Sequence, residues 1–368
     1  MRSLALAAAL ALAALARPAQ ACAPAPPPGV TVQIADETAI IAWDAAAHRE
    51  DFIRRASFRA SGKDFGFLVP TPGKPELAEV PDEVFARLDS ATSPEVIHQV
   101  KMGGVEPTLF CASLFLLNRK AAVSGAAAPV QVIETRRVAG YDAVVLEADS
   151  PDALADWLKA HGYAERAELS AWLAPYVAAK WKITAFKIAP VSLSVSPAHP
   201  PAPSAGDGSS VGTSAVRMSF TADRPFFPYR EPSDQREAAQ AAHADRLLRI
   251  FFFGTDRVEG TIGGAGAPGA KWPGRTVWSD HFDAKAAGTL PFPIPEGAWL
   301  TTFEDRASPR PGTDDLFFAK AASQDPVRPP PIVRIRQQKT PLPIDLIFGS
   351  LLLGAFVLRR LRKHFLQR

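Results

Sequence analysis

Two short glycine motifs have the residue types and spacing of catalytic or cofactor-binding loops. Residues 208–212 read GSSVG, the pattern of the serine hydrolase turn, with Ser210 in the nucleophile position. That turn needs a strand before it and a helix after it, but the flanking residues here are rich in proline, glycine and serine. Residues 264–269 read GAGAPG, as in dinucleotide-binding loops, but KWPG follows at 271–274, where a helix would have to begin. We therefore interpret both motifs as turns without chemistry.

The ionisable side chains form no recognisable catalytic or metal-binding pattern. Glu304-Asp305 and Asp314-Asp315 are acid pairs of sequence neighbours, which point to opposite faces of a strand and make poor acid/base partners; we expect them to be solvated. The histidines are scattered, at His48, His98, His161, His199, His243, His281 and His364. Neither a CxxC nor an HxxxH pair occurs. The sequence therefore predicts no catalytic residue, no metal site and no cofactor.

The first 21 residues have the layout of a secretory signal peptide. Arg2 is the basic start, Leu4 to Ala16 is an uncharged run, and Ala19-Gln20-Ala21 is the small-x-small pattern that signal peptidase cleaves. A buried N-terminal helix is the alternative, but such a helix has no need for a basic start, an uncharged run and a cleavage pattern together. We expect residues 1–21 to be removed and the rest of the chain to be exported.

Cys22 and Cys111 are the two cysteines of the chain, and in an oxidising compartment such a pair is expected to form a disulfide. That bond would tie the mature N-terminus to the body. Because Cys22 directly follows the cleavage site, lipidation is an alternative, although the preceding residues lack the expected leucine. Metal binding by two cysteines and distant histidines is a weaker alternative.

A second apolar segment lies near the C-terminus and is followed by a basic tail. Residues 346–358 (LIFGSLLLGAFVL) carry no charge, and RRLRKHFLQR at 359–368 holds five Lys/Arg and no acid. The helical run spans about 20 Å, and adding residues 342–344 and snorkelling arginines brings it close to the ~30 Å of a bilayer core. We expect a transmembrane helix with a cytoplasmic tail, by the positive-inside rule. An amphipathic surface helix is disfavoured because there is no polar face, and a cleaved sorting tail because no cleavage motif precedes it.

The charge balance argues against nucleic-acid binding. The chain has 41 Lys+Arg and 38 Asp+Glu. Taking away Arg2, Arg17 and the five tail cations leaves 34 basic and 38 acidic residues in the exported body, a net charge of −4. The expected partners are the membrane, through the C-terminal helix, and a protein of the cell envelope.

Periodicity predicts an α+β fold: a mostly antiparallel β body with an embedded strand–helix–helix–strand unit, plus the C-terminal transmembrane helix. Ser150 as N-cap, Pro151 in the first turn and Gly162 at the end mark the clearest helix. The other expected elements are a hairpin of strands at 30–34 and 38–43 with a polar break at 35–37, strands at 52–60, 64–69, 130–134, 143–148, 181–188, 215–221, 247–253 and 298–303, a buried strand or short helix at 108–117, and helices at 82–89 and 167–180. Pro70 is expected to end the strand at 64–69.

Composition divides the chain into seven expected segments. They are a signal peptide (1–21), an N-terminal β-rich domain with the α/β unit (22–195), a Pro/Gly/Ser linker or loop (196–214), a second β-rich part (215–322), a Pro/Arg-rich stalk (323–341), a transmembrane anchor (342–358) and a basic cytoplasmic tail (359–368).

Several blocks together resemble the bacterial family of domain of unknown function 2330. They are TVQIADETAIIAWD, DFGFLVPTPGKPEL, DALADWLKAHGY with the following WKITAFKI, AVRMSFTADRPFFPYR and the closing WLTTFEDRASPRPGTDDLFF. The resemblance covers about residues 22–320 and implies an exported, often membrane-tethered protein. It supplies no activity and no catalytic residues.

The sequence thus favours a non-catalytic binding or scaffolding protein of the bacterial cell envelope, with its body on the periplasmic or extracellular side of the cytoplasmic membrane. An exported hydrolase with an unrecognised site is one alternative. An accessory subunit of a membrane complex is another.

Overall fold

The structure is a computed structural model that falls into two compact units. Unit 1 comprises Met1–Ser93 and Glu134–Pro329, and unit 2 comprises Pro94–Ile133 and Pro330–Arg368. The residues that the structure describes are 23–25, 32–60, 65–108, 137–163, 166–188, 209–241, 246–264, 269–283 and 288–365. The expected signal peptide, Cys22 and Cys111 lie outside the described residues.

An eight-stranded sheet forms the centre of unit 1. Its strands follow the order β16 (Arg275–His281), β17 (Trp299–Asp305), β13 (Leu247–Gly254), β2 (Val32–Asp44), β3 (Arg49–Ala60), β11 (Val216–Thr221) and β5 (Glu76–Glu79), and β10 (Ser209–Gly212) also pairs with β3. The pairing is antiparallel except between β13 and β2, which run parallel. The hairpin expected from residues 30–34 and 38–43 is wrong, because these residues belong to one continuous strand, β2, with a register shift between Ile34 and Asp36 in place of a turn. The strand expected at 52–60 lies within β3, which pairs antiparallel with β2. The strand expected at 130–134, and the element expected at 108–117 apart from its first residue, lie outside the described residues.

Two smaller sheets complete unit 1. The five-stranded sheet has the order β1 (Ala23–Ala25), β4 (Gly66–Thr71), β9 (Lys182–Ile188), β8 (Tyr141–Leu146) and β7 (Arg137–Val138). The four-stranded sheet has the order β12 (Phe226–Phe227), β18 (Leu316–Lys320), β14 (Val258–Ile262) and β15 (Ala270–Lys271). The helices of this unit are α2 (Glu83–Thr92), α3 (Pro151–Ala160), α4 (Ala167–Ala178) and α5 (Ser233–Ala241).

The predicted strand–helix–helix–strand unit is β8, α3, α4 and β9. Ser150 is the N-cap of α3, and its side chain accepts a hydrogen bond from the backbone N–H of Ala153 at 3.1 Å. Pro151 occupies the first turn, where its missing N–H costs nothing. The observed fold class is α+β and rich in strands, with mostly antiparallel pairing.

Three apolar clusters pack between the sheets and helices of unit 1. The largest lies between one face of the eight-stranded sheet and the two smaller sheets, and includes Phe58 of β3 and Phe67 of β4. The second joins the other face of the five-stranded sheet to α3 and α4, through Leu68 and Trp172. The third lies on the opposite face of the eight-stranded sheet, where Phe85 of α2 is fully buried. Both faces of the central sheet are therefore covered.

Residues 196–214 do not separate two β-rich parts, which is a correction to the expected division. Strands from before this interval (β2, β3, β5) and after it (β11, β13, β16, β17) lie in the same sheet. Residues 209–212 are strand β10, antiparallel to residues 57–60 of β3. The turn without chemistry that was expected at the GSSVG motif is therefore wrong for residues 209–212. Ser210 lies in an extended strand that pairs with β3, although its Gly/Ser composition does not favour a strand.

The second glycine motif lies between two paired strands, and its residues 265–268 lie outside the described residues. β14 ends at Ile262 and β15 begins at Ala270, with these two residues opposite each other in an antiparallel pair. Gly263 and Gly264 have φ values of 71° and 98°, which glycine adopts without strain. A strand, β15, stands where a dinucleotide-binding loop would open a helix.

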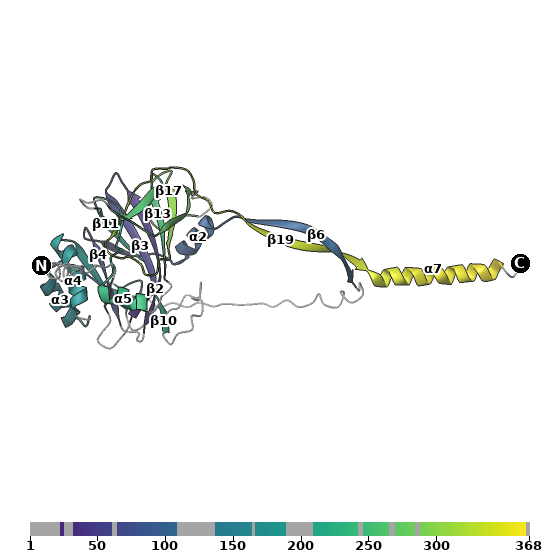
Figure 1. Cartoon of the computed structure of the whole chain (residues 1–368), viewed down its shortest axis with the longest axis horizontal. Coiled ribbons are helices and arrows are strands. Elements are labelled where there is room, and N and C mark those ends of the chain that lie inside the picture. The colour runs from purple at the N-terminus through teal and green to yellow at the C-terminus, as the bar shows by residue number, and fades with distance from the viewer. Residues whose placement is uncertain are drawn as a thin grey trace, which may run out of the picture. The chain divides into compact units, whose positions relative to one another are not determined.

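Unit 2 contains a two-stranded parallel ribbon and a helix. β6 (Val96–Thr108) pairs with β19 (Ile332–Pro343) from Val96 opposite Ile332 to Thr108 opposite Pro343. The helix α7 (Ile344–Phe365) follows β19 directly (Figure 1). Much of the expected stalk, and the first two residues of the expected anchor, are therefore strand. The backbone N–H and C=O groups of these residues pair with β6, which lies far away in the sequence. In the described part of the chain, no helix has both the length and the apolar character needed to cross a bilayer.

Candidate functional site

The two acid pairs noted in the sequence are only partly solvated, which corrects that expectation. Asp305 is 0% exposed and Asp315 is 4% exposed, whereas Asp314 has a side chain that is 45% exposed. Glu304 forms an ion pair with Arg249 at 2.5 Å. Neighbouring residues do point to opposite faces, as expected, but in each pair the inward face belongs to the core.

Asp305 lies at the end of β17 and accepts several hydrogen bonds. The hydroxyl of Tyr229 donates to Oδ2 at 2.6 Å, and the indole N–H of Trp272 donates to the same oxygen at 3.0 Å. The guanidinium of Arg310 stands 3.7 Å from this oxygen. Burial is the main cause that raises the pKa of the Tyr229 hydroxyl, and the charge of Asp305 raises it further. Tyr229 therefore acts as a neutral hydrogen-bond donor.

Glu231 joins two buried arginines to this carboxylate. A single nitrogen of Arg246, Nη2, lies 2.8 Å from both Glu231 oxygens, and Arg310 Nη1 lies 3.4 Å from Oε1. Burial by itself would lower the pKa of Arg310, but Glu231 and Asp305 hold it above its ordinary value. The arginines therefore stay charged inside the body.

Glu37 connects this group to the neighbouring strand β3. It forms a buried ion pair with Arg54, and its charge also helps to raise the pKa of Arg310. The connected buried charges are the carboxylates of Glu37, Glu231 and Asp305 and the guanidinium groups of Arg54, Arg246 and Arg310. Three negative and three positive charges balance, so we refer to these six residues as the buried ionic network.

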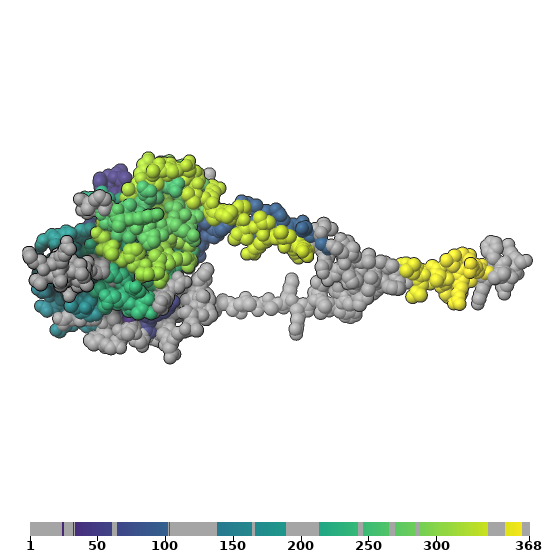
Figure 2. Space-filling view, in the orientation of Figure 1, coloured from purple at the N-terminus to yellow at the C-terminus, as the bar shows by residue number. Residues whose placement is uncertain are grey.

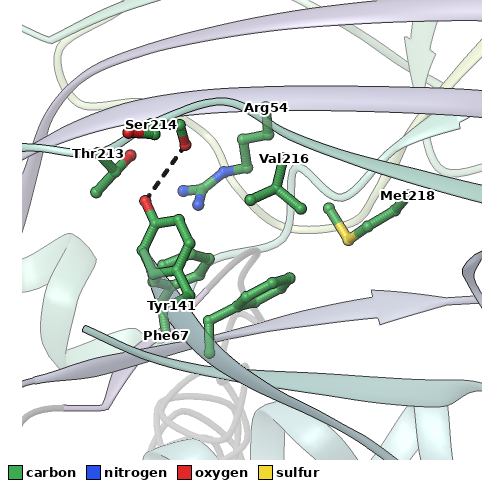
Figure 3. A pocket seen from close by; sticks show the side chains of 8 residues that line it. Arg54, Phe67, Tyr141, Thr213, Ser214, Val216 and Met218 are labelled. Atoms are coloured by element: carbon green, nitrogen blue, oxygen red, sulfur yellow. Dashed lines mark hydrogen bonds between the residues drawn. The ribbon is translucent and has the colours of Figure 1, made fainter. Parts of the chain in front are cut away.

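A small cavity lies beside Arg54, between the eight-stranded and five-stranded sheets. Figure 3 shows the hydroxyl of Tyr141 pointing at the carbonyl oxygen of Ser214, to which it donates at 3.5 Å. The guanidinium of Arg54 lies over the ring of Phe67 at 4.9 Å. The cavity measures about 10 Å³, about the space for the centre of one water molecule. Its lining residues are Arg54, Phe67, Tyr141, Phe186, Thr213, Ser214, Val216 and Met218.

Other buried carboxylates lie outside the network, and two of them, Glu50 and Asp315, have raised pKa values. Glu50 is fully buried and accepts a hydrogen bond from the backbone N–H of Phe226 at 3.0 Å. Burial raises the pKa of Glu50 well above its ordinary value, and the nearby charge of Asp51 adds to the effect. Asp51 in turn accepts a hydrogen bond from the hydroxyl of Ser219. Burial and the charge of Asp51 therefore both favour the protonated form of Glu50.

Asp315 is the second of these carboxylates and joins α4 to the four-stranded sheet. Its Oδ1 accepts hydrogen bonds from the Tyr176 hydroxyl at 2.9 Å and from the backbone N–H of Arg230 at 3.3 Å. Burial raises the pKa of Asp315 to about 6, against the lowering effect of the Arg230 guanidinium. The indole of Trp172 donates to the carbonyl of Arg230 at 2.9 Å, so a tryptophan lies next to this site.

The buried charged groups are held in ion pairs and hydrogen bonds with one another. Among the described residues, no group of three His, Cys, Asp or Glu side chains could hold a metal ion. The buried carboxylates face arginine, tyrosine or backbone donors, and the cavity has no room for an organic substrate. The chemistry that the geometry supports is the fixing of strands and loops to one another through charge-assisted hydrogen bonds.

Sequence reasoning did not find the buried ionic network. The one available signal is a charged residue on an otherwise apolar face of a strand, as with Arg54 between Phe52 and Ala56. A single charge in a strand does not show which distant residue pairs with it. The predicted disulfide residues Cys22 and Cys111 lie outside the described residues, so their pairing stays a prediction.

The fold and interior define a β-rich α+β protein whose layers are joined by buried ion pairs. Residues 17–288 match the family described as "Uncharacterized protein conserved in bacteria (DUF2330)", and the chain belongs to this family. The crystal structure of baculovirus P35 aligns with 82% of this chain and 96% of that chain at 7% identity. Its TM-score of 0.34 is too low to indicate a shared fold. None of the curated proteins matches the sequence.

Proposed function

We propose that the protein is exported, is held at the cytoplasmic membrane by α7, and acts by binding a partner in the cell envelope rather than by catalysis. The proposal joins the expected signal peptide at residues 1–21 to the character of unit 2. The body between them would lie on the periplasmic or extracellular side, and the basic tail in the cytoplasm.

The uncharged run of residues 346–358 in α7 is the observation that carries the proposal. Among the side chains of this run whose exposure the structure describes, Leu351, Leu352, Leu353, Phe356 and Leu358 are more than half exposed. Such a surface needs an apolar environment, since isolated soluble domains rarely expose a contiguous apolar patch of this kind. The run is shorter than a bilayer core, so the arginines that follow it would have to extend their side chains to the headgroups.

The interior of unit 1 supports binding rather than catalysis. Ser210, the one nucleophile that the sequence offered, lies in strand β10 instead of a strained turn. The buried arginines and carboxylates are used to hold the layers together, and the cavity beside Arg54 accommodates a single water. A stable body of this kind presents a fixed surface to a partner.

A role as an accessory subunit of a membrane complex is the second candidate, and the open ribbon of β6 and β19 favours it. Every residue of 95–101 and 331–337 is exposed. A two-stranded ribbon is marginally stable by itself. A neighbouring subunit that covers the ribbon would stabilise it.

The experiment is a comparison of two single-residue variants of the full chain in bacterial membranes. Leu352→Arg puts a charge in the middle of the uncharged run, at a cost of about 2.5–3.5 kcal/mol if the run lies in a bilayer. Leu361→Arg makes the same change inside the basic tail and is the matched control. We expect the wild type and Leu361→Arg to stay in membranes washed with alkaline carbonate, and Leu352→Arg to be released.

Equal release of all three proteins would refute the anchoring. Export is checked on the same samples, because the mature chain should begin at Cys22. A chain that still carries Met1–Ala21 in the membrane fraction would contradict the cleavage. The binding role is tested by a crosslinked pull-down from wild-type membranes, with Leu352→Arg as the reference.

A further inference from the structure

The ribbon of β6 and β19 leaves two sheet faces open to solvent. Parallel strands are usually covered on both faces in folded proteins. Here Ile97, Val333 and Ile335 are 37%, 46% and 59% exposed. Figure 2 shows β6 in blue beside β19 in yellow-green, with neither strand covered in that view. This exposed apolar surface requires a partner.

The pairing register divides the ribbon side chains between two faces of different character. Ile97 pairs with Val333, and Gln99 pairs with Ile335. Side chains alternate along each strand, so these residues share one face, with Lys101 and Gln337 at its end. We call this the apolar face. The other face, the basic face, consists of Val96, His98, Val100, Ile332, Arg334 and Arg336.

We propose that a second copy of this chain packs its apolar face against the same face of the ribbon. In a two-fold symmetric contact, the same surface patch of both copies forms the interface. Both faces expose three branched apolar side chains, but the faces differ in charge. The apolar face carries one charged side chain, Lys101, at its end, and its centre is uncharged. The basic face carries Arg334 and Arg336, which would approach their own copies and repel.

The position of α7 in the chain is compatible with this packing. α7 follows β19 without an intervening loop, since β19 ends at Pro343 and the helix begins at Ile344. A two-fold axis along the strands leaves both copies of α7 at the same end of the paired ribbons. Two chains held in one membrane need that arrangement. The pairing itself rests on the ribbon and not on the anchoring, so each can fail without the other.

The first experiment is photo-crosslinking of the full-length protein in intact bacterial cells. A benzophenone amino acid replaces Ile335 on the apolar face or Arg334 on the basic face, two neighbouring residues that differ in the face they occupy. We expect a covalent product of twice the chain's mass from position 335 and none from position 334. A crosslink from position 335 into the same chain or another protein would overturn the proposal, as would equal dimer formation from both positions.

The second experiment uses charge substitutions in co-expressed copies that carry different tags. Ile335→Asp puts like charges into the contact, so the two tags should no longer co-purify in mild detergent. Co-purification should return when one copy carries Ile335→Asp and the other Ile335→Lys. Arg334→Asp, on the basic face, should leave it unchanged. Each variant must reach wild-type levels in the membrane, and co-purification that is unaffected by Ile335→Asp would overturn the proposal.

Discussion

Asp315 should make the body more stable as the pH falls from neutral to mildly acidic values. Its pKa is about 6 in the folded chain, against an ordinary value of 3.8. Because the folded-state pKa is the higher one, the folded chain binds more protons than the unfolded chain between these values. The contribution of Asp315 to the free energy of unfolding is therefore complete below 3.8 and is lost as the pH rises through about 6.

The size of the effect follows from the shift. A difference of about two pKa units corresponds to about 3 kcal/mol, of which about 2 kcal/mol falls between pH 7 and pH 4. Other carboxylates act in the opposite direction, since the ion pair with Arg249 holds the pKa of Glu304 below its ordinary value despite partial burial. The contribution of Asp315 must therefore be measured as a difference between variants.

The variant Asp315→Asn isolates the contribution of this carboxyl group to the free energy of unfolding. Asparagine keeps an oxygen that can accept from the Tyr176 hydroxyl and the Arg230 backbone, but it cannot take up a proton. The assay is urea unfolding of the full-length protein in detergent, followed by tryptophan fluorescence, with Trp172 adjacent to the site. We expect the wild type to gain about 2 kcal/mol relative to Asp315→Asn when the pH is lowered from 7 to 4.

The matched control is Asp314→Asn, which removes a carboxylate from the neighbouring, half-exposed position. It should keep most of the pH-dependent gain, because Asp315 is still present and buried. If the unfolding free energies of the wild type and Asp315→Asn change in parallel with pH, the carboxyl group does not titrate in this range. The assignment of its raised pKa to burial would then be wrong.

Three further predictions concern the network, the disulfide and the extent of the body. Glu231→Gln removes the shared partner of two buried arginines and should cost about 3 kcal/mol in urea unfolding, whereas Glu76→Gln in an exposed pair should cost under about 1 kcal/mol. Unreduced mature protein should show Cys22 joined to Cys111 by mass spectrometry, and two free thiols or a lipid on Cys22 would refute the pairing. A chain that ends at Gly288 should be degraded in cells, and its accumulation at the level of the full chain would show that β17 and β18 are dispensable.

Elements with local signals were predictable from the sequence. The strand character of β2 follows from its period of two, and Ser150 and Pro151 define the start of α3. The turn expected at 35–37 was wrong, because β2 continues through these residues beside β3. Pro70 was expected to end a strand, but it lies inside β4. There β1 pairs only with Gly66 to Leu68, so the position of Pro70 needs no donor on that side. Whether a proline ends a strand therefore depends on which strand lies beside it, and the sequence does not show that neighbouring strand.

Elements that depend on distant partners were not predictable. β10 has a Gly/Ser-rich sequence and becomes a strand because β3 offers an unpaired edge. β19 follows three prolines and pairs with β6 from the other end of the chain. The burial of Asp305 likewise depends on Arg310 and on Tyr229, which comes from another part of the chain. From the sequence alone, a charged residue is expected to be exposed to solvent unless its buried partner is known.

The family match and the physical body do not end at the same residue. The match stops at residue 288, but β17 begins at Trp299 and lies between β13 and β16 in the central sheet. Without β17, the edge of β13 would be unpaired, and β16 would have no strand to join it to the sheet. Two of the six charges of the buried ionic network, Asp305 and Arg310, also lie beyond the match. Without Asp305 and Arg310, charges of the network that remain buried would lose their partners. Leaving a buried charge unpaired destabilises the folded chain more than the loss of an exposed contact does. The cooperative unit must therefore extend at least through β18, and the boundary of a sequence family is no guide to where this body can be cut.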